Sequence, residues 1–177
     1  MDPATLTVTE LVGGLRAAAA GSYPAEAATE LLIRHWRWLA RPQFLRACLR
    51  ALDGDSELRL AVDWSAVAVH VTTTDAPPAE RAVALIVVQL GQSPDLTASL
   101  ARKAPSLAPL GFLLIGLERR DVDLVLAAVS HGAGTQDQVE HVGEPGPTGE
   151  WRPTSTSPRL RLGPLHPWPE PALPGLD

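Results

Sequence analysis

The sequence predicts a mostly α-helical protein, a single-domain orthogonal helical bundle with at most a short β element. Two observations lead to this fold class. Apolar residues recur at helical spacing between capping signals along the first 134 residues, as in 118–132, where His131 and Gly132 suit a helix C-terminus. From residue 143 onward, 14 of 35 residues are proline or glycine, a composition that does not build helices or ladders. We therefore expect a helical globular domain over 1–134 and a Pro/Gly-rich, disordered or extended tail over 135–177.

Length and composition set further bounds. A chain of 177 residues is sized for one domain, and its net charge of −5 disfavours general binding to nucleic acid. Cys48 is the single cysteine, which excludes an internal disulfide and fits a reducing compartment. Neither a signal peptide nor an apolar run of membrane-spanning length is visible. We expect a soluble, cytoplasmic protein without membrane association.

Three helices are expected in the first 52 residues. Thr7 and Glu10 have the spacing of a capping box that starts the first helix, and Gly21-Ser22 ends it. A second helix is expected over 24–40, and a third begins at Pro42, since proline suits a first turn. The residues of the third helix that should face inward are Phe44, Leu45, Cys48, Leu49 and Leu52.

The segment 57–74 is ambiguous. Alternating apolar residues over 58–64 favour a strand, and the valines and threonines that follow also favour β structure. Asp63 as an N-cap favours a short β element followed by a helix instead. The alternative fold is α+β, with strands at 58–64, 67–73 and 83–90.

The second half of the domain is expected to be helical. Residues 78–90 are apolar nearly all round, which predicts a central, buried helix. A short helix with a polar face is expected over 95–103, followed by an apolar segment over 110–117. In the last helix the predicted apolar stripe consists of Val122, Val125, Leu126 and Val129.

Two patches carry a resemblance. Val62-Asp63-Trp64-Ser65-Ala66-Val67 and the segment 116–131 resemble a recurring module in uncharacterised proteins of high-GC Gram-positive bacteria. That module has V/I-D-W-x-A-A, a proline, an S-x-x-E helix, then G-L-D-R-R-N and a helix ending in H-A-x-G. The resemblance covers residues 62–134; Glu118 and Asp121 depart from its Asp and Asn, and residues 75–78 replace its S-x-x-E cap. It implies a mostly helical domain, and so a helix after Asp63, and it implies no activity.

The most distinctive candidate surface lies within residues 31–52, which contain no acidic residue. Arginines interleaved with aromatic side chains can grip phosphates or an acidic protein partner. They can equally form a solvated helix face paired with Asp53, Asp55 and Glu57, and these readings stay open. The residues of this candidate binding surface are Arg34, Trp36, Arg37, Trp38, Arg41, Arg46 and Arg50, with Phe44 among them.

The tail offers a second candidate. Residues 164–174 are rich in proline, which pre-organises an extended conformation and lowers the entropy lost on docking. Trp151 and Trp168 are hydrophobic anchors, the latter between Pro167 and Pro169. A partner-binding linear motif is one interpretation, and a passive tail is the other.

Catalytic chemistry has no signature in this sequence. His35 and Cys48 lie on apolar helix faces, which predicts a locally hydrogen-bonded core histidine and a packed thiol. No histidine pair has metal-ligand spacing, so no metal or cofactor is expected. We expect a non-catalytic protein-interaction or adaptor module with a protein partner, an acidic protein being one candidate. The alternatives are a nucleic-acid-associated regulator, which the net charge disfavours, and an enzyme without a recognisable motif.

Overall fold

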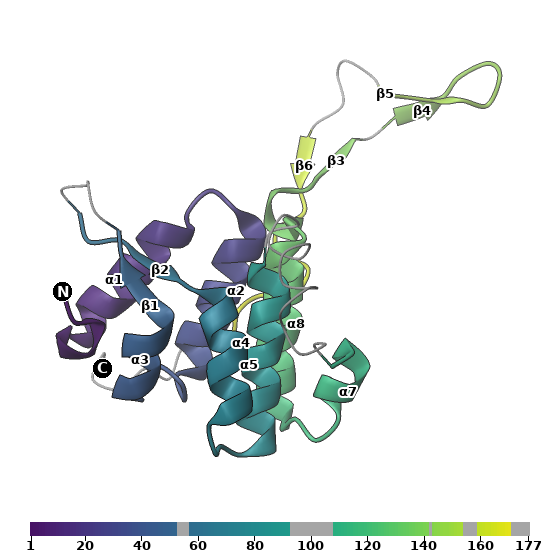
Figure 1. Ribbon diagram of the computed structural model, residues 1–177. Coiled ribbons are helices and arrows are strands. Elements are labelled where there is room, and N and C mark those ends of the chain that lie inside the picture. Colours follow the sequence, from purple (N-terminus) through teal and green to yellow (C-terminus); the bar gives the residue numbers. More distant parts are fainter. Residues whose placement is uncertain (53–56, 93–107, 142, 154–158, 171–177) are drawn as a thin grey trace.

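The computed structural model describes residues 1–52, 57–92, 108–141, 143–153 and 159–170 (Figure 1). Its helices are η1 (Pro3–Thr5), α1 (Val8–Ala19), α2 (Tyr23–His35), α3 (Pro42–Cys48), α4 (Trp64–Thr73), α5 (Pro78–Gly91), α7 (Leu110–Leu114), α8 (Arg119–Gly132) and η2 (Thr135–Asp137). Its strands are β1 (Leu49–Ala51), β2 (Leu60–Val62), β3 (Val139–His141), β4 (Gly143–Pro145), β5 (Trp151–Pro153) and β6 (Arg159–Arg161). The predicted mostly α fold with a short β element is confirmed. The helix expected over 95–103 lies outside the described residues.

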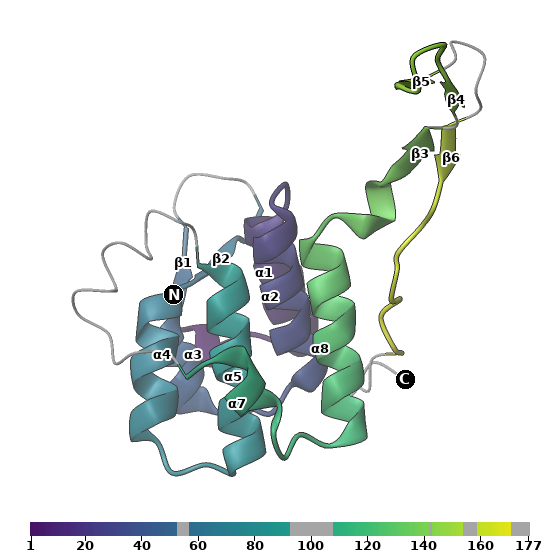
Figure 2. The same cartoon turned by 90° about the vertical axis from the view of Figure 1, so that its right-hand side faces the viewer.

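The core is organised around α2. This helix packs against α8 on one side and α5 on the other, while α4 packs against α5 and α3 (Figures 1 and 2). Its residues Leu31, Leu32 and Ile33 are almost fully buried. Because consecutive residues are all covered, α2 is enclosed on several faces, which requires neighbours on more than one side. The predicted central helix, α5, contributes Val83, Ala84, Ile86, Val87 and Val88 to the same core.

Local capping signals determine where several helices begin. The Glu10 amide donates to Thr7 Oγ1 and the Thr7 amide donates to Glu10 Oε2, so the predicted capping box starts α1. Asp63 accepts a hydrogen bond from the Ala66 amide at 2.9 Å and starts α4. Residues 57–74 therefore form a short strand and then a helix, and the alternative α+β fold, with strands over 67–73 and 83–90, is not the one observed.

Two helix ends differ from the sequence prediction. α2 ends at His35 and not at Ala40, because Trp36 adopts a left-handed conformation with φ of 64°. α3 ends at Cys48, because residues 49–51 pair antiparallel with residues 60–62. Leu52, expected to face inward, is consequently exposed.

The break at Trp36 turns Trp38 into the core, so its place on the candidate surface is wrong. Trp38 is fully buried, its indole N–H donates to the Glu80 carbonyl at 2.9 Å, and its ring lies 5.5 Å from that of Phe44. Arg41 stacks over the same indole at 4.3 Å. A large aromatic side chain gains more from this burial than from a solvated helix face, and the backbone turn at Trp36 makes the burial possible.

The buried face of α8 also differs from the predicted stripe. Leu126 and Val129 are 48% and 44% exposed, whereas Ala127 and Ala128 are fully buried. Small residues face α2 because they permit a close approach: a Cβ placed on Gly132 would lie 3.4 Å from that of Ala27. α8 therefore continues through Gly132, and the left-handed glycine that follows it is Gly134, with φ of 69°.

The tail has more structure than its composition predicts. Strands β3 and β6 pair antiparallel, as do β4 and β5, so the expectation that this segment forms no ladder is wrong. The chain accommodates its glycines in the turn between β4 and β5, where Gly149 has φ of 84°. The ladders project from the helical body as an arm, and residues 162–170, here called the strap, return along α8 (Figure 2).

None of the helices in the described ranges is long and apolar enough to cross a membrane.

Cys48 packs in the core, as the sequence predicts. Its side chain is fully buried, and this burial raises the pKa of the thiol to about 12. Because the thiolate is the reactive form, we expect no reaction with a disulfide reagent at pH 8 until the protein unfolds. Absorbance should show that one thiol per chain reacts in denaturant. Without denaturant, no thiol should react over the same minutes. Prompt reaction of the folded protein would contradict this packing.

Candidate functional site

The structure places four of the five predicted arginines in separate ion pairs. Their guanidinium groups lie 2.6–3.0 Å from carboxylates on other turns or elements, and Arg37 alone of the five has no such partner within the described ranges. Asp53 and Asp55, two of the acids suggested as partners, lie outside the described residues. An arginine paired with a carboxylate contributes little net positive charge that could attract a ligand. The pairs are Arg34 with Glu30, Arg41 with Glu80, Arg46 with Asp2 and Arg50 with Asp63.

The strap brings together two residues that the sequence placed in different candidate sites. The Arg34 guanidinium lies 5.2 Å from the ring centroid of Trp168, and its Nη1 donates to the Pro169 carbonyl. The His131 ring lies 6.1 Å from that of Trp168. A guanidinium over an indole face is a favourable cation–π contact. Trp168 is thus held by side chains from α2 and α8 together.

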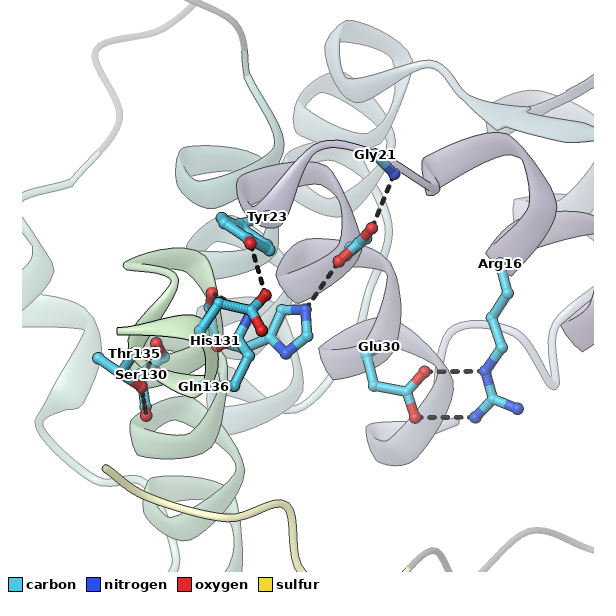
Figure 3. A network of polar contacts seen from close by, with 10 residues as sticks. Arg16, Gly21, Tyr23, Glu30, Ser130, His131, Thr135 and Gln136 are labelled. Atoms are coloured by element: carbon cyan, nitrogen blue, oxygen red, sulfur yellow. Dashed lines mark hydrogen bonds and ion pairs between the residues drawn. The ribbon is translucent and has the colours of Figure 1, made fainter. Parts of the chain in front are cut away.

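Two hydroxyl groups, one on α8 and one on η2, hold the strap backbone. The Leu165 amide donates to Thr135 Oγ1 at 3.2 Å, and the His166 amide donates to Ser130 Oγ at 3.0 Å. The Thr135 hydroxyl donates to the Ser130 carbonyl, so the Ser130 hydroxyl is the donor in the 2.7 Å contact between them (Figure 3). Both side chains are buried, and their hydroxyl groups bond to each other, to the Ser130 carbonyl and to the strap. His166 Nε2 lies 3.4 Å from Asp123 Oδ1, which adds a further contact.

These contacts define the strap groove, which we describe by the body residues that touch the strap. The strap runs beside α8 without helix or strand structure (Figure 2), and its contacts come from side chains of α2, α8 and η2. Its contact residues are Arg34, Asp123, Ser130, His131 and Thr135.

A cavity of about 400 Å³ adjoins the groove beside Trp168. Glu30 on its wall accepts from Arg16 at 2.9 and 2.8 Å (Figure 3). It also accepts from Arg34 at 2.6 Å. Burial alone would raise the pKa of Glu30, but the hydrogen bonds and charges of the two arginines lower it overall. Glu30 is therefore a fixed carboxylate that orients both guanidinium groups. The cavity is lined by Arg16, Ala19, Ala20, Glu26, Thr29, Glu30, Arg34, His131 and Trp168.

His131 is fixed by its own partners. Its Nε2 lies 2.9 Å from Glu26, and Glu26 also accepts from the Gly21 amide at 2.8 Å (Figure 3). The Tyr23 ring packs edge-on against the imidazole, and the Tyr23 hydroxyl donates to Asp137 at 2.6 Å. The groove is preorganised because its side chains have partners besides the strap.

Sequence reasoning identified Arg34, Trp168 and Pro169 of this site and missed Ser130, His131 and Thr135. His131 was interpreted as a helix-end cation, and nothing local distinguishes its role in the groove. Of the remaining candidates, Trp36 is partly buried, Pro167 is exposed, and Trp151 belongs to β5 in the arm. Among the described residues, no three His, Cys, Asp or Glu side chains gather closely enough to hold a metal ion.

A second, smaller cavity of about 150 Å³ lies at the other end of α2. His35 lines it and is buried, as predicted, but its Nδ1 has no hydrogen-bond partner among the described residues, so the expected local hydrogen bond is wrong. The helix was expected to continue to Ala40 but ends at His35, because the backbone turns at Trp36. The His35 ring is therefore separated from the residues that would have followed it on the helix. Its Nε2 lies 3.9 Å from Asp121, an ion-pair distance and no hydrogen bond.

Burial lowers the pKa of His35 to about 4, which predicts a pH-dependent stability. The unfolded chain binds this proton near pH 6.5 and the folded chain only near pH 4, so stability is lost as pH falls through that window. The loss should total about 3 kcal/mol. Urea titrations of the wild type and His35→Leu between pH 7 and pH 4 measure it, because the difference between their free energies of unfolding should change by this amount. A constant difference would contradict the burial of a neutral imidazole.

Comparison of the chain with protein-family models, with curated proteins and with solved structures gives no match. The resemblance of residues 62–134 to the bacterial module stays a prediction, and the geometry of the strap groove is what bears on function.

Proposed function

We propose that the protein is a non-catalytic protein-interaction module and that the strap groove is its recognition surface. The observation that carries this proposal is the occupied groove. The helical body binds a proline-rich segment through the Leu165 amide, the His166 amide and the Pro169 carbonyl, together with one side chain, Trp168. Main-chain hydrogen bonds combined with a pocket for a chosen side chain are the means by which domains recognise extended peptides.

The preorganisation of the groove supports the same function. Glu30 orients Arg34, Glu26 orients His131, and the Ser130–Thr135 pair is ordered by its own hydrogen bonds. A proline-rich ligand also loses little conformational entropy on binding. When the surface and the ligand are both ordered before binding, less free energy is lost on ordering them, and the affinity is higher.

The alternatives have less support. Four of the five arginines proposed for phosphate contacts are paired with carboxylates, and the net charge is −5. A nucleic-acid-binding surface needs unpaired positive charge. Arg37 is exposed and unpaired within the described residues, but one arginine gives little affinity for a phosphate backbone. The buried His35 is neutral at pH 7, and its cavity of about 150 Å³ has room for a small molecule only.

The test uses the full chain carrying Trp168→Ala, which removes the strap's anchor and leaves the groove residues intact. We expect this variant to bind immobilised proline-rich peptides, and we expect Arg34→Ala in the same background to weaken binding about tenfold. The reason is that this change removes both the cation–π contact and the hydrogen bond to a peptide carbonyl. Surface plasmon resonance measures the affinities.

Arg46→Ala is the matched control, because Arg46 is also an ion-paired arginine but lies on α3, away from the groove. Equal losses for the Arg34 and Arg46 variants, or no peptide binding by the Trp168 variant, would contradict the proposed function.

A further inference from the structure

The strap is held by a single anchoring side chain. Trp168 packs against the hydrophobic core from the outside, whereas Leu162 and Leu165 are 55% and 82% exposed. The other strap contacts involve backbone atoms and the exposed pair between His166 and Asp123. A groove that holds one large side chain of a segment distinguishes ligands chiefly by that side chain.

The contacts set chemical requirements at successive positions of a ligand. The residues at the positions of Leu165 and His166 must have free amides, because both donate to hydroxyl groups. A tryptophan is required between Arg34 and His131, where a flat aromatic face receives the guanidinium. The carbonyl after it must point toward Arg34, and prolines on either side of the tryptophan favour that extended backbone.

The strap leaves part of the site unfilled. The cavity of about 400 Å³ beside Trp168 remains open, and its walls carry Arg16, Glu26 and Glu30. A longer segment from another protein can place side chains there and gain contacts that the strap does not make. Such a segment can therefore displace the strap although the strap, being tethered, competes at a high effective concentration.

We propose that the partner of this groove is an extended segment of another protein, with a tryptophan between two prolines preceded by two residues with free amides, and that the strap is its internal competitor. This inference rests on the proposed function and adds the chemistry of the partner and the regulation of the groove. The strap weakens binding of the partner, because the apparent association constant is the intrinsic constant multiplied by the fraction of molecules whose groove is uncovered.

The experiment titrates full-length protein into a fluorescently labelled peptide with the sequence of residues 162–170, Leu-Gly-Pro-Leu-His-Pro-Trp-Pro-Glu, and follows fluorescence polarisation. The wild type should bind at least about tenfold more weakly than the Trp168→Ala chain, because its groove is covered. His166→Pro, which removes one strap hydrogen bond and leaves Trp168 in place, should also bind more tightly than the wild type. A second peptide with alanine in place of tryptophan should bind the Trp168→Ala chain at least about tenfold more weakly than the first.

The outcomes separate this inference from the function on which it rests. Equal affinity of the wild type and both strap variants would overturn the competitor role, and equal affinity of the two peptides would overturn the tryptophan requirement. Either result leaves a peptide-binding groove. No binding of either peptide to either strap variant, with helical circular dichroism unchanged, would remove the proposed function itself. Wild-type dimers in sedimentation that Trp168→Ala abolishes would show that the strap is exchanged between copies, and would overturn a foreign partner.

Discussion

The close packing of α8 on α2 is the constraint on which the rest of this structure depends. Ala27 and Ala28 of α2 are fully buried, as are Ala127 and Ala128 of α8, and a Cβ added to Gly132 would lie 3.4 Å from that of Ala27, at the short limit of van der Waals contact. Small side chains at a helix contact let two backbones approach, and large ones would hold them apart. That approach brings Arg34 of α2 and His131 of α8 to the wall of the same cavity, so the groove exists because the two helices touch.

Electrostatic pairing then fixes the groove in one arrangement. Glu30 joins Arg16 of α1 to Arg34 of α2, while Glu26 of α2 joins His131 of α8. Exposed pairs of this kind add little stability individually. Their effect here is orientation, because each carboxylate holds a cation or an imidazole where the strap meets it. The arginines that the sequence predicted as a basic surface are paired within the protein and position side chains there.

The sequence was informative where structure is determined locally. Thr7 and Glu10 predicted the start of α1, and Asp63 predicted the start of α4, because capping bonds join residues three apart. The end of α2 was not predictable in this way, since the turn at Trp36 is compensated by burial of Trp38 against Phe44 and Glu80, which come from other elements. The face of α8 was mispredicted because α2 selects alanines and not the larger Leu126 and Val129. The site itself joins Arg34 to Pro169, residues 135 positions apart, and no local pattern encodes such a contact.

The central claim is that the strap lies in the groove, held by hydroxyl groups on α8 and η2. Amide hydrogen exchange of Leu165 and His166, followed by NMR on the full chain, tests it most directly. Both amides donate to buried side-chain oxygens, so they should exchange at least about tenfold more slowly than the same amides in a free peptide. Exchange at the free-peptide rate at both positions would show that the groove is not occupied in this way, and the account built on it would be wrong.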